Sequence, residues 1–327
     1  MAVQNSLLRA VDVLPLPSLR TQRRIAGAVV LTQGGIAVTG AIVRVTASGL
    51  GCPTWPQCFP GSFVPVPVAE VPIVHQAVEF GNRLITFLVV LTAALAVLAV
   101  VRARRRREVI VYACLMPAST VLQAVLGGIT VLTGLLWWTV AIHLLVSMAM
   151  VWLAVLLFVK IGEPDPADGA GPPELLVPKP LRQLTALCGV ALSVVLVTGT
   201  MVTGAGPHAG DKSIEAPVPR LMLDIVTLVY RHSALVAAYL ALLIGLAFGL
   251  LAVRAPRPVT MRVVVLLVVV ALQGMVGTVQ FFTGVPAVLV AVHVAGAAVQ
   301  MAATAALWAS MRSRSVVERA EPQPVQS

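Results

Sequence analysis

Apolar residues occur along this chain in eight long runs that are separated by short polar or charged segments. The run at 84–101, for example, has eighteen residues without a charge. Because the bilayer core offers no hydrogen-bond partners, segments of this kind cross it as helices. The pattern predicts spans at residues 25–45, 74–101, 109–131, 137–159, 183–203, 223–253, 262–282 and 286–311. The predicted fold class is an all-α polytopic membrane protein.

One stretch occurs twice. Residues 122–143 match 272–293 at a constant offset of 150, with eight of 22 positions identical. The identical pairs are Leu122/Leu272, Gln123/Gln273, Gly127/Gly277, Thr133/Thr283, Gly134/Gly284, Val140/Val290, Ala141/Ala291 and His143/His293. Each half then has four spans, and an even number gives both halves the same orientation. The repeat therefore predicts two four-helix bundles related by a pseudo-twofold axis along the membrane normal.

Composition and charge placement agree with a membrane protein. The chain is 58% hydrophobic and 11% charged, with mean hydropathy +0.95. Eighteen of its 23 Lys and Arg fall in the tails and alternate loops, which is the positive-inside pattern and disfavours nucleic acid as a partner. We expect a multi-pass cell-membrane protein with a cytoplasmic tail (1–24), a first bundle (25–160), a Pro-rich cytoplasmic linker (161–182), a second bundle (183–311) and a cytoplasmic tail (312–327).

Four polar positions lie at one depth within the predicted spans. His143, His232, His293 and Asn82 each fall about 9 to 13 Å inside the outer end of a span, at about 1.5 Å per residue. The two imidazoles of the second half, His232 and His293, can ligate a haem iron from both sides. The alternative is that each histidine only hydrogen-bonds a neighbouring helix. Zinc fits less well, because it needs three or four converging ligands.

The first half departs from the second at one of these positions. Asn82 aligns with His232 at the same offset, and an amide is a poor iron ligand. Glu79 lies on the same helix face as Asn82, and a carboxylate at this depth marks a functional site. The alternative is a Glu79–Arg83 ion pair at i, i+4. The halves are thus predicted to differ, with an electron-transfer site in the second and an open, reactive site around Glu79 and His143 in the first.

Other polar residues lie near the outer ends of the spans. Arg44, Arg83 and Arg231 can pair with haem propionates, although ordinary snorkelling toward the interface explains each equally well. Cys52 and Cys58 share the first outer loop, where an oxidising exterior favours a disulfide.

Two loop segments resemble a known family. The segment from Arg44 to Cys58, RVTASGLGCPTWPQC, resembles the first outer-loop signature of haem A synthases, and 204–211, GAGPHAGD, resembles its counterpart in the second half. Together with the spans and the repeated histidines, the resemblance covers residues 25–311. It implies a membrane oxidoreductase that oxidises a methyl group of haem O to a formyl group, giving haem A for cytochrome oxidase.

The resemblance also implies site assignments. Haem b would be held by His232 and His293, substrate haem O would lie near Glu79 and His143, and the two loop cysteines would be paired. The family commonly has a second histidine where this chain has Asn82, so ligation of the substrate haem from both sides is in doubt. Expected partners are a haem O synthase and an electron donor, and the oligomeric state is open.

Two other classes compete with this interpretation. A b-type cytochrome subunit that oxidises quinol would need both sites closed, which Glu79 and Asn82 oppose. A secondary transporter would have helices broken at mid-membrane, whereas here the Gly and Pro interruptions fall mainly at the outer turns.

Overall fold

The computed structural model describes residues 11–211 and 218–315, so parts of both predicted tails and of the second outer loop lie outside the described residues. Within that part of the chain are eight helices long and apolar enough to cross a membrane. They are α2 (Leu19–Val45), α3 (Ile73–Arg102), α4 (Arg107–Leu132), α5 (Trp137–Gly162), α6 (Lys179–Ala205), α7 (Ile225–Ala252), α8 (Arg257–Phe282) and α9 (Ala287–Ser310). The predicted fold class, with its eight spanning helices, is confirmed.

Local sequence explains where several of these helices begin and end. The Ser18 hydroxyl caps α2 by accepting from the Thr21 N–H at 3.1 Å, and Asp224 caps α7 by accepting from the Thr227 N–H at 2.8 Å. The hydrogen bonds from the side chain and backbone of Thr227 lower the pKa of the exposed Asp224 carboxyl. At the other type of end, α4 and α8 stop before Gly134 and Gly284, which have φ of 64° and 79°. Glycine adopts this left-handed backbone without a steric penalty.

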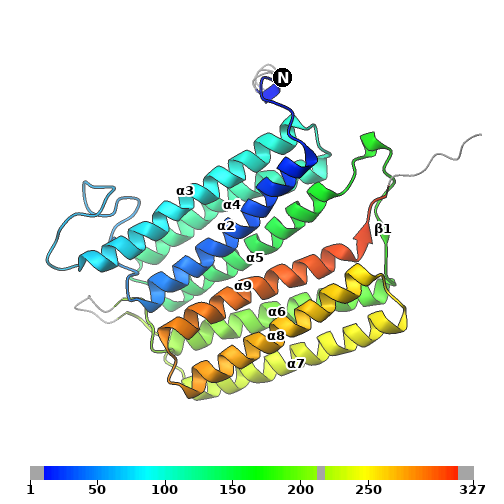
Figure 1. Cartoon of the computed structure of the whole chain (residues 1–327). Helices are drawn as coiled ribbons and strands as arrows, with labels where there is room; N and C mark the ends of the chain where they lie inside the picture. Colours follow the sequence, from blue (N-terminus) through cyan, green and yellow to red (C-terminus); the bar gives the residue numbers. More distant parts are fainter. Residues whose placement is uncertain (1–10, 212–217, 316–327) are drawn as a thin grey trace, which may run out of the picture.

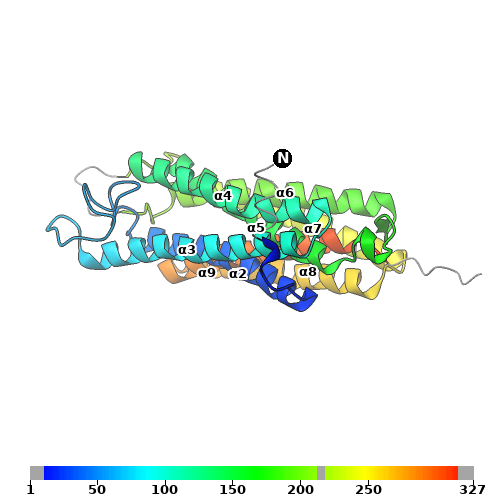
Figure 2. The ribbon, with the colours of Figure 1, turned by 90° about the horizontal axis from the view of Figure 1, so that it is seen from above.

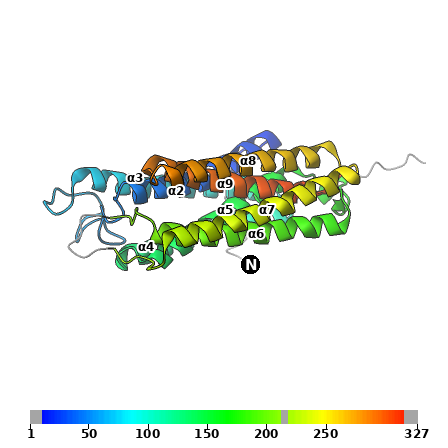
Figure 3. The ribbon, with the colours of Figure 1, turned by 90° about the horizontal axis from the view of Figure 1, so that it is seen from below.

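The eight helices run roughly side by side along the long axis of the molecule (Figures 1, 2 and 3). In Figure 1, α2 to α5 lie above α6 to α9. Between the halves, α9 contacts α2 and α5, and α5 also contacts α6. One apolar core lies mainly among α6 to α9 and another among α2 to α5. The pseudo-twofold relation of two bundles stays a prediction.

We call the two ends of the molecule the loop end and the arginine end. The loop end carries residues 46–72, between α2 and α3, and the arginine end carries the turn between α3 and α4. At the arginine end, β1 (Glu174–Leu175) pairs antiparallel with β2 (Arg312–Ser313). The linker and the start of the C-terminal segment, expected to be separate polar segments, are thus joined because each satisfies the other's backbone hydrogen bonds.

Two arginines of the basic run lie inside the protein at this end. The side chain of Arg105 donates to Asp165 at 2.6 Å, and Arg106 donates to Asp165 at 2.8 Å and to Glu163 at 2.6 Å. Both arginine side chains are 8% exposed. These ion pairs fasten the α3–α4 turn to the segment that follows α5, and Lys160 joins them through Glu163 at 3.0 Å.

Candidate functional site

The repeated histidines have matching surroundings in the two halves. Gln123 donates to the carbonyl oxygen of His143 at 3.3 Å, and Gln273 donates to that of His293 at 2.6 Å. Each imidazole also lies against a glycine of the preceding helix: a Cβ on Gly127 would stand 3.4 Å from Cε1 of His143, and one on Gly277 would stand 3.0 Å from Cε1 of His293. The residues repeated in sequence therefore make the same contacts, which orient His143 and His293 alike.

The partner position shows both the likeness and the difference of the halves. In the second half, Thr198 on α6 lies 3.0 Å from Nδ1 of His232 on α7. In the first half, Thr39 on α2 donates to Oδ1 of Asn82 on α3 at 2.6 Å. Both halves thus have a threonine hydrogen bond at this position, with an amide as the partner in one half and an imidazole in the other.

The Thr198 contact also selects the tautomer of His232. The Thr198 hydroxyl has the Val195 carbonyl oxygen as an acceptor at 2.9 Å. With its hydrogen donated there, it accepts the Nδ1–H of His232, which leaves the Nε2 lone pair for a metal. The imidazoles of His232 and His293 are close enough for their charges to interact. The second half thus brings together two histidines from α7 and α9.

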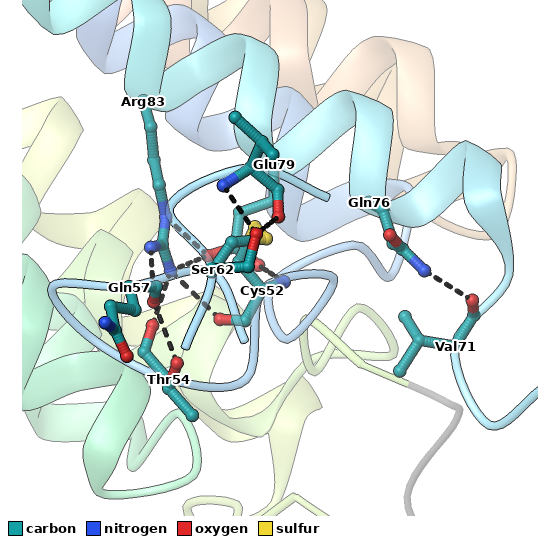
Figure 4. Close-up of a disulfide and its surroundings, with 10 residues drawn as sticks. Cys52, Thr54, Gln57, Ser62, Val71, Gln76, Glu79 and Arg83 are labelled. Atoms are coloured by element: carbon teal, nitrogen blue, oxygen red, sulfur yellow. Dashed lines mark hydrogen bonds and ion pairs between the residues drawn. A yellow bond between two sulfur atoms is a disulfide. The ribbon is translucent and has the colours of Figure 1, made fainter. Parts of the chain in front are cut away.

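Glu79 is held at the loop end by two partners (Figure 4). Its Oε2 accepts the Cys52 N–H at 2.7 Å, and its Oε1 accepts from Nη2 of Arg83 at 2.7 Å. Glu79 is 5% exposed, so both contacts lie in a poorly hydrated environment. The ion pair weighed in the sequence analysis is present, and it is combined with a backbone contact to the first outer loop.

Arg83 continues this attachment into the loop. It donates to the carbonyl oxygens of Cys52 at 2.9 Å, Thr54 at 3.0 Å and Gln57 at 3.2 Å. A disulfide joins Cys52 to Cys58, as predicted. We call residues 52–58 the disulfide loop. Arg83 therefore acts first as a fastener of this loop to α3, and its predicted contact with a propionate stays a prediction.

The other two candidate arginines lie in different settings. Arg44 is part of a connection between the halves, because it donates to the carbonyl oxygens of Thr203 at 2.9 Å and His208 at 3.0 Å. Arg231 is exposed, next to His232 on α7. Neither position tests a role in holding propionates.

The outer loops of the two halves also meet. Ser48 and Asp211 form a β-bridge, and the Gly49 N–H donates to the Gly210 carbonyl oxygen at 2.8 Å. The carboxylates of Asp211 and Glu79 are close enough to interact electrostatically. An acid of the second half thus lies near the acid of the first, and sequence reasoning did not single out Asp211.

Sequence reasoning also missed the threonines. Thr39 and Thr198 belong to a repeated Val-Thr-Gly triplet at 38–40 and 197–199, whose offset is 159 instead of 150. Thr39 precedes Asn82 by 43 residues and Thr198 precedes His232 by 34. The first outer loop, between Val45 and Ile73, is longer than the second, between Ala205 and Ile225, so a search at one constant offset does not find the triplet.

The surroundings of the three histidines bear on whether they can hold a haem. Nδ1 of His143 and Nδ1 of His293 are buried without a hydrogen-bond partner among the described residues. An iron bound at Nε2, as inferred for His232, would leave these Nδ1 atoms unpaired, so they do not decide whether the rings hold a haem. A Cβ built on Gly127, Gly199 or Gly277 would lie within 3.4 Å of the imidazole next to it. A larger residue at any of these positions would therefore crowd the ring. Histidine is a usual ligand of haem iron, and the glycines leave room beside each imidazole, so these residues fit a haem.

The fold and site define a class: a polytopic membrane protein with paired intramembrane histidines in one half and an acid with a single histidine in the other. Comparison with known proteins places it further. The profile of the cytochrome oxidase assembly protein family, COX15-CtaA, matches residues 23–305. The chain belongs to this family, and the resemblance to haem A synthases is confirmed.

Individual relatives point the same way. The chain is 36% identical over 101 residues to a "Heme A synthase" of Geobacillus kaustophilus, covering 31% of this chain and 30% of that protein. It is 30% identical over 183 residues to that of Halalkalibacterium halodurans, covering 54% and 58%. It is 27% identical over 212 residues to that of Staphylococcus aureus strain JH9, covering 62% and 66%. The matches therefore span a third to two thirds of these relatives.

Proposed function

We propose that this protein is a haem A synthase, an oxidoreductase that converts a methyl group of haem O into the formyl group of haem A for cytochrome oxidase. The observation that carries the proposal is the asymmetry between the halves. The threonine contact is repeated at Thr39 and Thr198, yet it holds Asn82 in one half and His232 in the other. The similarity to the heme A synthases described above supports the choice of reaction.

In this proposal the second half, residues 183–311, holds haem b between His232 and His293. Haem iron with two protein ligands transfers electrons, whereas iron with one retains a position for reaction. Thr198 sets the tautomer of His232, and Gln273 orients His293 through its carbonyl oxygen. The metal ligands of the protein are then His143, His232 and His293.

The first half, residues 25–160, binds the substrate haem O beside His143, with Glu79 and His143 as the catalytic residues. Oxidising a methyl group releases protons, and the Glu79 carboxylate is placed to accept one. Arg83 keeps this acid oriented, and the Cys52 N–H stabilises its charge. The disulfide loop covers the end of the site near Glu79 and limits the access of water.

We also propose how the protein is oriented in the membrane. The spans are even in number, so α2 begins and α9 ends at the arginine end, which faces the cytoplasm by the positive-inside rule. The tails (1–24, 312–327) and the linker (161–182) are then cytoplasmic. Haem O synthase supplies the substrate, and an electron donor supplies electrons to haem b.

The test is reconstitution of the purified protein with haem O and a redox partner, with the products identified by mass. We expect haem A, and we expect the pigments extracted from the protein to include haem b together with haem O or haem A. Haem b alone would indicate a b-type electron carrier instead. Protein without any haem, after expression with haem supplied, would refute the proposal and favour a transporter.

A further inference from the structure

The disulfide loop carries one aromatic residue, Trp55, whose ring lies against helix α4. A Cβ built on Gly128 would stand 2.6 Å from Cδ2 of Trp55 and 2.9 Å from both Cε2 and Cε3. Any side chain larger than hydrogen would therefore collide with the indole. The ring packs directly on the backbone of α4, and Gly128 is the residue that makes room for it.

This contact is one residue along α4 from the contact made by the histidine of the first half. The His143 ring packs against Gly127, which precedes Gly128 on α4. A Cβ built on Gly127 would stand 3.4 Å from Cε1 of His143. Two neighbouring glycines thus receive two rings, one from the disulfide loop and one from α5. Trp55 is 39% exposed, so the contact with Gly128 leaves much of the indole available to another group.

The position of Trp55 is fixed from α3 as well as from α4. The carbonyl oxygens of Cys52, Thr54 and Gln57 accept from Arg83, and the Thr54 hydroxyl donates to the Gln57 carbonyl oxygen at 2.9 Å. The disulfide closes the loop around Trp55. A side chain that is held on both sides is preorganised to contact a ligand at little further entropic cost.

The second half differs at the corresponding place. At the offset of 150, Gly128 corresponds to Thr278, whose hydroxyl donates to the Gly274 carbonyl oxygen at 2.8 Å. The flat glycine surface under Trp55 is therefore a property of the half that has Glu79 and a single histidine. This distribution connects Trp55 with the reactive site and not with the site of His232 and His293.

We propose that Trp55 contacts the substrate: its indole packs against the planar group bound beside His143 and fixes the orientation of that group toward Glu79. The inference rests on the proposed function, since it needs a planar substrate in the first half. Aromatic rings stack on planar groups with a gain that corresponds to about a tenfold change in binding. Trp55 is then a substrate-positioning residue of the disulfide loop.

The first arm of the test compares Trp55→Ala and Trp55→Phe in the full-length protein purified with its haems. We measure the haem O retained per haem b, KM and kcat for haem O, and free thiols. We expect Trp55→Ala to raise KM about tenfold and to lower retained haem O, with a smaller effect on kcat. Trp55→Phe should restore most of the loss, and both variants should keep haem b and the disulfide.

The second arm moves the ring without changing it. Gly128→Ala places a methyl group where the indole lies, so it should reproduce the rise in KM seen for Trp55→Ala. The control is Gly245→Ala on α7, where a Cβ meets nothing within 4 Å, and it should behave like the unchanged protein. A purely structural role predicts loss of the disulfide or of haem b instead, with no rescue by phenylalanine.

The outcomes separate this inference from the proposed function. If the unchanged protein makes haem A while Trp55→Ala retains haem O and KM at normal values, the role of Trp55 is refuted and the function stands. If Trp55→Ala exposes thiols and Trp55→Phe does not restore KM, the residue only supports the loop and the inference is also refuted. If the unchanged protein neither binds nor converts haem O, the proposed function itself fails.

Discussion

The two halves of the molecule share their framework and differ in its contents. In each, a glutamine holds the carbonyl oxygen of a histidine, a glycine receives the imidazole, and a threonine on the first helix binds a polar residue on the second. That polar residue is His232 in one half and Asn82 in the other. The likeness extends to the arginine end, where Arg23 lies 5.3 Å from the Phe158 ring and Arg182 lies 4.4 Å from the Trp308 ring.

The supporting contacts are thus alike in the two halves, although the polar residues that they hold differ. Replacing one imidazole by an amide leaves the threonine contact intact, so the helices need not move for the two sites to take different roles. The first half then adds the Glu79–Arg83 pair and the disulfide loop. The same framework thereby holds two different sets of polar side chains in the two halves.

The largest expected effect comes from removing a histidine of the second half. His232→Ala or His293→Ala should remove the low-spin haem b signal, because each leaves the iron without one of its two protein ligands. Absorption spectra of the purified variants give the measurement. His143→Ala is the matched control and should keep haem b, since His143 lies in the other half. Unchanged spectra in both His232→Ala and His293→Ala would end the assignment of these ligands.

The next largest effect comes from changing Glu79 in the first half. Glu79→Gln keeps one oxygen, which can accept either from the Cys52 N–H or from Arg83, while an NH2 group takes the place of the other oxygen. It removes the charge and the ability to accept a proton. Loss of a general base costs about 100-fold or more in rate. We expect haem A production to fall by this order while haem b and the disulfide are kept.

The opposite result for Glu79 would also be informative. If Glu79→Gln makes haem A at the normal rate, the acid serves only to fasten the disulfide loop through Cys52 and Arg83. Glu79→Ala should then still be impaired, because it removes both contacts. Free-thiol counts on both variants show whether the loop stays closed.

A third change makes the halves more alike. Asn82→His should let Thr39 hold an imidazole as Thr198 holds that of His232, and so supply a second ligand to the haem of the first half. We expect that haem to shift toward low spin in optical and electron paramagnetic resonance spectra. The double change Thr39→Val with Asn82→His should weaken the shift. A spectrum identical to the unchanged protein would show that position 82 does not face the iron.

How much of this was predictable follows from where each signal lies in the chain. Apolar runs were sufficient for the eight helices, and the offset of 150 was sufficient to mark Gln123, Gly127 and His143 as repeated positions, because those residues share one short segment. Their contacts with one another come from the structure. Thr39 lay beyond that reach, since the longer first outer loop changes the offset. The packing of Trp55 on Gly128 joins a loop to a helix far along the chain, and only the folded structure brings them together.

The positions of the charged residues also predicted only part of what the structure shows. The basic run after α3 is typical of a cytoplasmic loop, but sequence does not reveal that Arg105 and Arg106 are buried with Asp165 and Glu163. Their partners lie more than 50 residues away. Likewise Arg44 was a candidate for haem propionates, whereas the structure shows it bonded to carbonyl oxygens of the second half.

The smallest expected effect concerns a position where the halves already differ. Ser147 accepts from Gln123 at 2.6 Å and donates to the His143 carbonyl oxygen at 2.9 Å, and its counterpart at the offset of 150 is Ala297. The second half orients His293 without a hydroxyl, because Gln273 donates to its carbonyl oxygen at 2.6 Å. Ser147→Ala should let Gln123 approach His143 in the same way.

We therefore expect Ser147→Ala to cost about 1 kcal/mol of stability, the net value of one hydrogen bond. We expect haem A production to change by less than about twofold, because Gln123 can still donate to the His143 carbonyl oxygen. Thermal denaturation followed by haem absorption gives the first quantity. Ala297→Ser is the reciprocal change and should leave the haem b spectrum as it is. Loss of the substrate haem from Ser147→Ala, with haem b kept, would instead mean that His143 depends on the hydroxyl in a way that His293 does not.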